Sequence, residues 1–380
     1  MSEQVSRVRA FSRHIDWFLI LPALLLTGIG LLTMHTFGVG YSLAPRQLVW
    51  MIIAFAVYIS ISFIDVRALR RTSLIMVLYW FVLILLVILL VAGHTIMGAK
   101  SWFVFGGLSF QPADLAKLVL IALLAKYLSR RHVEIADWRH IVVTGTYSLL
   151  IVLLVLMEPD LGTAVIIGSI WFGLMLVSGI SKKHLAAIII LLTLAATFLW
   201  SFGLKPYQRA RIVTFVNPAA DIRGAGYNAY QAMIAVGSGE LFGKGIGYGT
   251  QSQLRFLPEY QTDFIFAAYA EEWGFFGVLL LLSLYGILLA RLFIIARHSA
   301  TNFDAFFTIG VAILFLAHIV VHIGINIGLL PVTGTTIPFM SYGGSHLIME
   351  FAALGVVTSF ARFARAAPRE VLKDQMSALE

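Results

Sequence analysis

Acidic side chains concentrate in one short segment of an otherwise apolar chain, residues 257–274 (LPEYQTDFIFAAYAEEWG). Glu259 and Asp263 come just before a long apolar run, and Glu271 and Glu272 lie about two turns inside it. An ionised group at membrane depth costs roughly 2.5–3.5 kcal/mol on insertion scales, so it persists where function or a buried partner requires it. We therefore expect the chemistry of this protein in or near this segment.

Asp263 is the strongest candidate for a general base, or for a ligand of a cationic or hydroxyl group. It follows Thr262, a residue type favoured at helix N-caps, which places Asp263 in the first turn of the next predicted helix. The helix dipole stabilises a carboxylate there by about 0.3–1 kcal/mol, so a purely structural role is the alternative. The neighbouring Glu259 and the basic loop before it favour the chemical role.

A second candidate group opens the apolar run at residues 112–127. Asp114 and Lys117 are three residues apart, so they share one face of a helix and can form an ion pair. This pair is either structural or part of an outward-facing cleft, and Lys117 could serve both roles by meeting a phosphate. Asp160, in the short turn before residues 161–181, is expected at the same face of the membrane.

Other polar motifs have more ordinary interpretations. His318, His322 and Asn326 recur every four residues. Two histidines at this spacing can bind zinc, but without an HExxH motif a polar seam between helices is the commoner use. Glu350, like the paired glutamates of the acidic segment, is expected to be neutral or paired inside the bundle. The glycine-rich residues 237–249 match neither the P-loop nor the Rossmann spacing, which argues against an ATPase.

The composition places these groups in a membrane. Hydrophobic residues make up 60% of the chain, charged residues make up 12%, and the mean hydropathy is +0.91. The absence of cysteine excludes disulfides, cysteine-ligated zinc and thiol catalysis. Runs of roughly 17–25 apolar residues can cross the ~30 Å hydrocarbon core. The sequence predicts an all-α membrane protein with ten transmembrane helices at residues 17–33, 47–64, 72–93, 112–127, 141–157, 161–181, 185–204, 273–290, 305–330 and 332–349.

The distribution of lysine and arginine predicts the orientation of this bundle. An even number of spans puts both termini on one side, and with that side cytoplasmic the inner segments hold 18 of the 27 basic residues. The net charge of +8 is then mostly this bias, which favours contact with anionic membrane lipid and requires no nucleic acid. We expect one transmembrane domain over residues 1–380, with the N- and C-termini cytoplasmic.

Three loops are expected on the outer face. The longest, residues 205–262, joins the seventh and eighth predicted helices, and its residues 226–236 have the spacing of a short interfacial helix. Residues 93–111 are rich in glycine, and residues 330–345 are uncharged. Three such loops above a bundle that holds acidic groups predict an outward-facing cleft, roofed by the long loop and lined by the carboxylates and the lysine described above.

Three stretches of sequence carry a resemblance to a known family. They are PYQRARIVTFVNPAAD…GAGYNAYQAMIAVGSGELFGKGIGYGTQSQLRFLPEYQTDFIFAAYAEEWGFFG, MEPDLGTA at residues 157–164, and TGTTIPFMSYGGS at residues 333–345. On these residues the chain resembles the SEDS family of bacterial cell-wall polymerases. Within that family it resembles the elongation branch, RodA, more than the division branch, FtsW. The resemblance runs from about residue 16 to about residue 362.

The resemblance implies a ten-helix enzyme of the bacterial cytoplasmic (inner) membrane that joins lipid II units on the extracytoplasmic side. It also implies two kinds of partner, namely a class B penicillin-binding protein that cross-links the product and the elongation machinery. The essential aspartate of the family corresponds to Asp263, and its carboxylate–lysine pair corresponds to Asp114 and Lys117. This chain reads Pro-Ala-Asp where the family usually has Pro-Ser-Glu, and it has Gln261 where the family usually has histidine.

The chemistry that the resemblance implies is inverting glycosyl transfer. Asp263 takes the proton of the acceptor 4-hydroxyl, a single displacement at the donor C1 forms a β-1,4 bond, and undecaprenyl pyrophosphate leaves. Negative charge on the leaving group needs nearby cations. The substrate-binding candidates are Asp114, Lys117, Asp160, Arg46, Lys100, Arg209, Arg211 and Lys244. A divalent cation, Mg²⁺ or Mn²⁺, is a further possible source of positive charge, although no metal motif in the sequence fixes one.

Two other functions stay open on the sequence. A flippase or transporter of a lipid-linked precursor also suits ten spans and buried glutamates, but the sequence has no visible inverted repeat and its acids gather at the outer face. A non-enzymatic scaffold for a partner synthase is the third reading. It predicts that replacing Asp263 leaves function intact.

Overall fold

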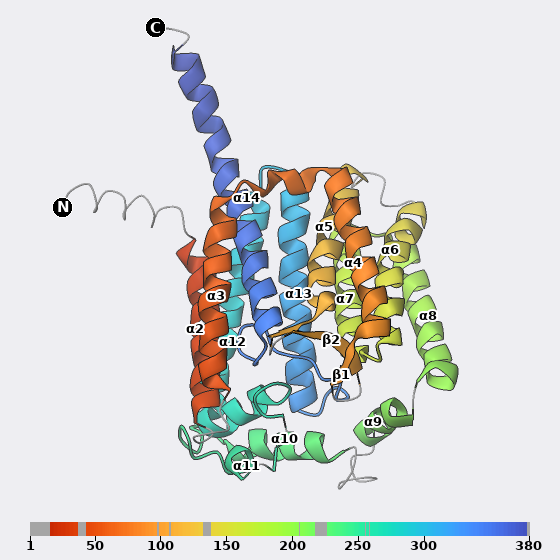
Figure 1. Ribbon diagram of the computed structural model, residues 1–380, viewed down its shortest axis with the longest axis vertical. Coiled ribbons are helices and arrows are strands. Elements are labelled where there is room, and N and C mark those ends of the chain that lie inside the picture. Colours follow the sequence, from red (N-terminus) through yellow and green to blue (C-terminus); the bar gives the residue numbers. More distant parts are fainter. Residues whose placement is uncertain are drawn as a thin grey trace, which may run out of the picture.

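The computed structural model describes residues 16–36, 43–96, 99–105, 108–131, 138–204, 206–216, 226–254, 256–257 and 259–377. Most of these residues lie in long helices that stand side by side in one bundle (Figure 1). Eight of the described helices are long and apolar enough to cross a membrane. They are α2 (Trp17–His35), α3 (Ala44–Phe63), α4 (Thr72–Ala92), α6 (Trp138–Met157), α8 (Lys182–Phe198, prolonged by η2, Leu199–Gly203), α12 (Ile265–Arg297), α13 (Asn302–Asn326) and α14 (Gly344–Ser377).

Two further helices complete the ten that the sequence predicts. The helix α5 (Pro112–Arg131) carries the expected ion pair, and α7 (Leu161–Val177) is a shorter apolar helix. They lie in the middle of the bundle, where α5 packs on α4 and α13 and α7 packs on α6 and α13. Many of their apolar side chains are buried, as expected for helices surrounded by other helices.

The predicted tenth span is wrong in its position. Residues 331–343, which we call the connecting loop, are not helical, and α14 begins only at Gly344. Hydropathy alone did not separate the two, because an uncharged loop folded into a bundle is as apolar as a span. Such backbone is tolerated at membrane depth only where protein groups satisfy it. Here Gln47 of α3 does so, since its side-chain Nε2 donates to the Ser341 carbonyl at 3.1 Å and its Oε1 accepts from Gly343 N at 3.2 Å.

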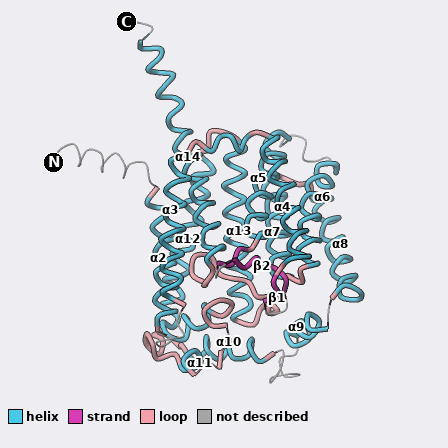
Figure 2. The backbone as a smooth tube through the Cα atoms, in the orientation of Figure 1, coloured by secondary structure: helices cyan, strands magenta, loops and turns pink. Residues whose placement is uncertain are grey.

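The other irregular segments lie at one end of the bundle. This end is opposite the one from which the C-terminal part of α14 projects. Three short antiparallel strands form a sheet in the order β1 (His94–Ile96), β2 (Ala99–Phe105) and β3 (Leu108–Phe110), where the sequence predicts only a loop. Figure 2 shows these strands among the loops at one end of the helices. The helices α9 (Pro206–Val216), α10 (Tyr227–Ser238) and α11 (Thr250–Gln253) lie across the same end (Figure 1).

The predicted interfacial helix at residues 226–236 is confirmed as α10. It packs on α12 and α13, where Ala232 and Ala235 are buried against Phe264, Ala267 and Ala268. The small alanine side chains on α10 and α12 let these two helices approach closely. This part of the long loop is therefore packed onto the bundle.

The helix α12 is interrupted at Gly274, whose φ of 65° and ψ of −164° are not helical. The break frees backbone groups, and the glycine-rich loop at residues 239–249 bonds to them. Phe275 N donates to the Glu240 carbonyl at 2.9 Å, and Lys244 N donates to the Glu271 carbonyl at 3.0 Å. Because buried peptide groups need partners, the loop and the broken helix stabilise each other.

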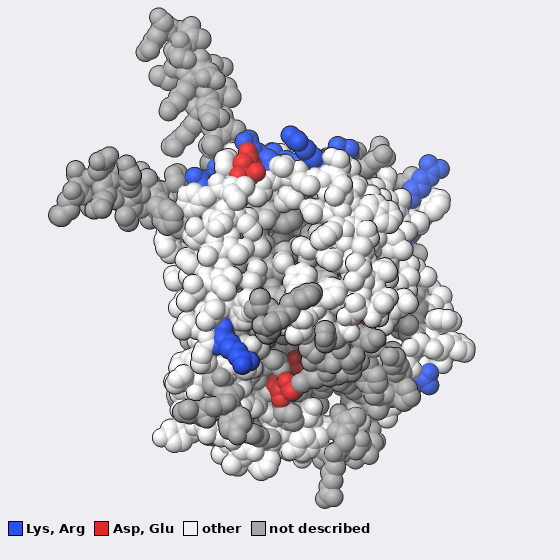
Figure 3. Space-filling view, viewed as in Figure 1, with Lys and Arg blue, Asp and Glu red and all other residues white. Residues whose placement is uncertain are grey.

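Basic side chains gather at the end of the bundle from which α14 projects, whereas acidic side chains are recessed in a hollow near the other end (Figure 3). At the basic end, Arg70 pairs with Asp304 at 2.7 Å and Arg291 pairs with Asp16 at 2.6 Å. The gathering of basic side chains at one end, with acidic partners among them, is the pattern from which the sequence predicts the orientation, and the orientation itself stays a prediction.

Candidate active site

Asp263 lies in a turn that leads into α12. The helix begins at Ile265 after an N-cap residue, Phe264, that has no capping side chain. The expectation that Thr262 is the N-cap and that Asp263 lies in the first turn is therefore wrong. The reason is local, because the Thr262 hydroxyl donates to Glu259 Oε2 at 3.2 Å and closes the turn itself. Asp263 therefore lies before the first turn of α12, the turn in which the helix dipole was expected to stabilise its carboxylate.

The connecting loop holds this turn in place. Ser341 Oγ donates to the Thr262 carbonyl at 2.8 Å, and Asn326 Nδ2 donates to the Asp263 carbonyl at 3.1 Å. A methyl group added to Gly334, which has a φ of 75°, would stand 3.5 Å from Asp263 Oδ2. The backbone of the connecting loop thus passes directly beside the carboxylate.

Asp114 and Lys117 form the predicted ion pair, with Lys117 Nζ 2.7 Å from Asp114 Oδ1. Both residues are nearly buried, at 2% and 3% exposed. Lys117 Nζ also lies 3.3 Å from His318 Nε2. The other ring nitrogen of His318 is 3.1 Å from the Thr336 carbonyl, which can only accept, so Nδ1 carries the hydrogen and Nε2 accepts from the lysine. The lysine is therefore aimed by two partners from different helices.

Asp160 is the N-cap of α7. Its carboxylate accepts from Thr163 N at 2.9 Å and from Thr163 Oγ1 at 2.8 Å, and Gln111 Nε2 donates to it at 3.2 Å. Gln111 immediately precedes α5, and its N–H donates to Ser345 Oγ at 3.3 Å. Burial raises the pKa of Asp160, while the Thr163 hydrogen bonds and the nearby Lys117 charge lower it. The structure thus brings Asp160 close to the ion pair, as the sequence predicts.

Glu158, two residues before that N-cap, is a buried acid that sequence reasoning did not single out. It is 0% exposed, and neither of its carboxylate oxygens has a hydrogen-bond partner within the described chain. Burial, with a smaller contribution from Asp160, raises the pKa of Glu158 from 4.5 to about 8. An unpaired buried carboxylate is costly, so the group holds a proton at neutral pH.

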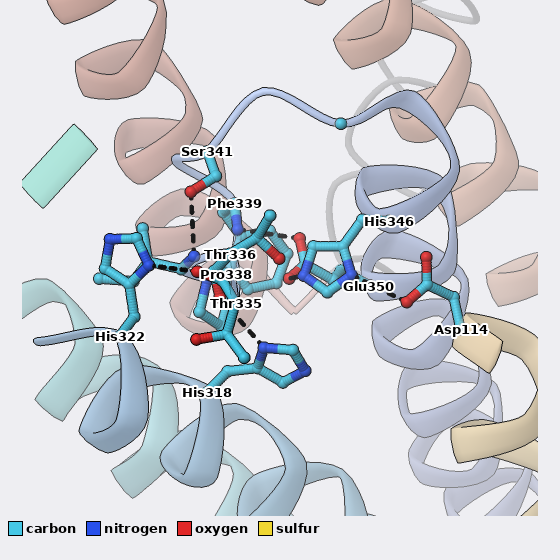
Figure 4. A network of polar contacts seen from close by, with 12 residues as sticks. Asp114, His318, His322, Thr335, Thr336, Pro338, Phe339, Ser341, His346 and Glu350 are labelled. Carbon is cyan, nitrogen blue, oxygen red and sulfur yellow. Dashed lines mark hydrogen bonds and ion pairs between the residues drawn. The ribbon is translucent and has the colours of Figure 1, made fainter. Parts of the chain in front are cut away.

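The predicted polar seam on α13 is confirmed, and it serves the connecting loop. His322 Nδ1 donates to the Thr335 carbonyl at 2.7 Å, next to the bond that His318 makes to Thr336. Asn326 Nδ2 donates to the His322 carbonyl at 2.8 Å as well as to the turn of Asp263. Figure 4 shows how His318 and His322 approach the loop from one helix. Within the residues that the structure describes, no group of three or more ligand side chains could hold a metal ion.

Lys244 is placed beside the broken helix. Its Nζ lies 2.7 Å from Glu271 Oε1 and 2.8 Å from Thr250 Oγ1. Glu271 also accepts from Gln251 N at 3.0 Å and from Ser252 Oγ at 3.2 Å. The expectation that Glu271 is paired is confirmed, and the charge of Lys244 is engaged in holding the glycine-rich loop.

The other basic candidates are spread around the end of the bundle opposite the projecting part of α14. Arg46 is exposed in the first turn of α3, and Arg209 of α9 donates from Nη2 to the Ser201 carbonyl at 3.1 Å. The side chains of Lys100 and Arg211 lie outside the described residues, although their backbones belong to β2 and α9. A substrate-binding role for these four residues stays a prediction.

A family model described as "Cell cycle protein", which covers FtsW, RodA and SpoVE, matches residues 11–366. The chain belongs to this FtsW/RodA/SpoVE family. It is 38% identical over 282 residues to the peptidoglycan glycosyltransferase MrdB of Escherichia coli, covering 74% of this chain and 76% of that protein. It is 34% identical over 369 residues to stage V sporulation protein E of Bacillus subtilis, covering 92% and 98%.

Solved structures agree with this assignment to the FtsW/RodA/SpoVE family. RodA of Thermus thermophilus is similar with a TM-score of 0.69 and 33% identity, covering 91% of this chain and 96% of that chain. A chain from a peptidoglycan synthase complex, described as coordinating polymerization and crosslinking, is similar with a TM-score of 0.78 and 34% identity, covering 92% and 98%. The predicted family and the predicted class of fold, a polytopic helical membrane protein, are confirmed.

Two residues of this FtsW/RodA/SpoVE-family chain, Gln261 and His346, have roles that sequence reasoning missed. Gln261, at the position where a histidine was expected, accepts from Leu43 N at 2.8 Å and so ties the turn of Asp263 to the start of α3. His346 lies 3.2 Å from Asp114 and 2.9 Å from Glu350. The available signal was the four-residue spacing of His346 and Glu350 on α14, shortly after the glycine pair at residues 343–344.

Proposed function

We propose that this protein is a peptidoglycan glycosyltransferase that joins lipid II units into β-1,4-linked glycan strands during cell elongation and releases undecaprenyl pyrophosphate. Its family and its relatives, named peptidoglycan glycosyltransferases, support the reaction class. The observation that carries the proposal is structural. The connecting loop holds the turn of Asp263 by a hydrogen bond to its backbone. The same loop accepts a hydrogen bond from His318, and the other ring nitrogen of His318 contacts the ammonium of Lys117.

In the proposed reaction Asp263 is the general base. It takes the proton of the acceptor 4-hydroxyl as that oxygen bonds to C1 of the donor sugar, while the bond from C1 to the pyrophosphate oxygen breaks on the opposite face. A single displacement of this kind inverts the configuration at C1. In this proposal Lys117, which is paired with Asp114 and has Asp160 nearby, is the cation that balances the negative charge developing on the leaving group.

The chain is a multi-pass membrane protein, and we propose that its basic end faces the cytoplasm of a bacterial cell. The recessed acidic groups then face outward, where the glycan is built. Because the chain has no cysteine, single introduced cysteines and a membrane-impermeant thiol reagent test this orientation directly. Labelling of a cysteine beside Arg46 in intact cells, but not of one beside Lys182, is the expected result.

We also propose that a class B penicillin-binding protein acts with this chain and cross-links its product, together with the elongation machinery. The supporting observation is the similarity to a chain of a peptidoglycan synthase complex. Co-purification with the transpeptidase of the same organism tests the proposal. Recovery of this chain alone under conditions that preserve its activity would contradict it.

The decisive experiment uses purified protein and lipid II in detergent, where no membrane separates two compartments. Glycan polymer formed there supports the enzyme, because a flippase produces no polymer. Asp263→Asn and Asp263→Ala should each lower the rate by on the order of 10²–10⁴-fold, the typical contribution of a general base. Glu259→Gln is the matched control, since this acid lies in the same turn and glutamine keeps its bond to Thr262.

Two outcomes would redirect the proposal. If Asp263→Asn retains more than about a tenth of the wild-type rate, the base lies elsewhere, with Asp114 and Asp160 the next candidates. If the wild-type protein makes no polymer but its Asp263 variants still support growth, the scaffold function is favoured.

A divalent cation, Mg²⁺ or Mn²⁺, belongs to this proposal only as a counter-ion of the pyrophosphate. The carboxylate nearest to the proposed leaving group, Asp114, is already paired with Lys117, and no cluster of three ligands accompanies it within the described ranges. The protein therefore does not present a metal cage of its own there. Polymerisation assayed in EDTA, with and without added Mg²⁺ or Mn²⁺, tests the requirement.

A further inference from the structure

His346 is held between two acids that come from different parts of the chain. Its Nδ1 lies 3.2 Å from Oδ1 of Asp114 on α5, and its Nε2 lies 2.9 Å from Oε1 of Glu350 on its own helix. Figure 4 shows the imidazole between the two carboxyl groups. The Nδ1 contact is a hydrogen bond, whereas the Nε2 contact has the distance of an ion pair without hydrogen-bond geometry, and a buried carboxylate beside each ring nitrogen favours a positive charge on the ring. The arrangement is therefore that of an imidazolium bridging two carboxylates.

The charges around this bridge balance only if His346 is a cation. Asp114, Glu350 and His346 are 2%, 4% and 8% exposed, so little water screens them. Lys117 supplies one positive charge for the two carboxylates, and His318, whose ring centroid is 5.0 Å from that of His346, is neutral in the hydrogen bonds described above. The imidazolium supplies the second positive charge, so the two carboxylates that it faces are matched by two cations.

The bridge also reaches the connecting loop at a strained point. Phe339 has a φ of 64°, a conformation that bulky residues rarely adopt. Its N–H donates to Glu350 Oε2 at 2.8 Å, and Tyr285 Oη donates to the preceding carbonyl, that of Pro338, at 2.6 Å. Glu350 thus accepts from the loop with one oxygen and faces His346 with the other.

We propose that His346 is a positioning residue, which as an imidazolium ties Asp114, and through it Lys117, to Glu350 and the connecting loop that carries the turn of Asp263. This inference rests on the proposed function. A continuous chain of contacts then runs from the turn of Asp263, the proposed base, to Lys117, the proposed cation. The carboxylate of Asp114 is then fixed by two cations, Lys117 and His346, rather than one.

A double-mutant cycle between His346 and Glu350 tests this link. His346→Gln leaves two buried carboxylates and one cation, so the rate of lipid II polymerisation should fall on the order of tenfold to a hundredfold, the loss expected when reacting groups are misplaced. The loss should fall on kcat rather than on KM, because the pair acts on charge that develops during the reaction. Adding Glu350→Gln removes the surplus negative charge, so the double variant should be several-fold more active than His346→Gln alone.

The matched control is His298→Gln, because His298 is an exposed histidine at the basic end of α12 and its loss should leave the rate unchanged. A double variant that is no better than His346→Gln, or a His346→Gln protein of wild-type rate, overturns the proposal. If His346→Gln does not fold, the double variant decides: a folded, active double variant supports the charge link, and an unfolded one refutes it.

The same cycle is measured as the thermal midpoint of each purified protein in detergent. This readout does not depend on catalysis, so it separates the two proposals. If the wild-type protein makes no polymer, the proposed function fails, while a higher midpoint for the double variant than for His346→Gln still supports the charge link. Additive midpoints refute the link whatever the activity.

Discussion

The ion pair between Lys244 and Glu271 should decide how firmly the glycine-rich loop is docked. Glu271→Gln keeps the shape and one carbonyl acceptor but removes the charge. A hydrogen bond to a charged group contributes about 1.5–3 kcal/mol and a neutral one about 0.5–1.5 kcal/mol, so the change should cost about 1–2 kcal/mol. Lys244 is partly exposed, which keeps the cost in this range because its ammonium can turn to water. The opening equilibrium of the loop should rise by about 5–30-fold.

Amide hydrogen exchange in detergent measures this opening. The amides of Lys244, Gly245 and Gln251, which donate to the carbonyl groups or the carboxylate of Glu271 and Glu272, should all exchange faster by that factor. Glu240→Gln is the control, because this exposed acid lies in the same loop and the substitution keeps the backbone hydrogen bonds that it makes there. Exchange at these amides that stays within twofold of wild type in Glu271→Gln would show that the ion pair does not hold the loop.

Three further outcomes are expected. Gly274→Ala should lower the thermal midpoint strongly, because its Cβ would stand 2.2 Å from Gly243 N at a φ of 65° and the strain alone costs on the order of 1–3 kcal/mol; a midpoint equal to wild type would contradict this. Wild-type stability should fall as pH rises from about 4.5 to about 8, since over this window folded Glu158 keeps a proton that the unfolded chain has lost. Thermal midpoints of the wild type and Glu158→Gln measured across this pH range test the effect, because the variant should lack this part of the fall. Asp304→Asn breaks the ion pair with Arg70 at the basic end, so it should destabilise the protein by a few kcal/mol in a thermal scan while the rate per folded molecule stays unchanged.

The bundle could be predicted from the sequence because its main signal is local. Each long apolar run forms a helix whatever its neighbours are, since lipid offers no partner for an unbonded peptide group. Hydropathy failed to predict the structure where an apolar segment is surrounded by protein instead of lipid. The connecting loop is uncharged and buried, so hydropathy took it for a span, although His322 and Gln47 satisfy its backbone.

The candidate site was predictable to the extent that its contacts are short in sequence. Asp114 and Lys117 are three residues apart, and helical geometry alone places them together. His346 is 232 residues from Asp114, and no periodicity reports a contact of that kind. The capping prediction for Thr262 failed for another reason, because its hydroxyl had a second local acceptor in Glu259 that competed with the helix.

The distant contacts of the connecting loop have a consequence for how the protein is made. Gln47 donates to a carbonyl 294 residues later, and α14 packs along α3 for much of its length. A ribosome delivers α3 and α5 to the membrane long before it delivers α14. During synthesis, then, Asp263 and Lys117 are both already in the bilayer while the loop that aligns them does not yet exist. On the proposed function, we expect the nascent chain to be inactive towards substrate until its final helix is inserted.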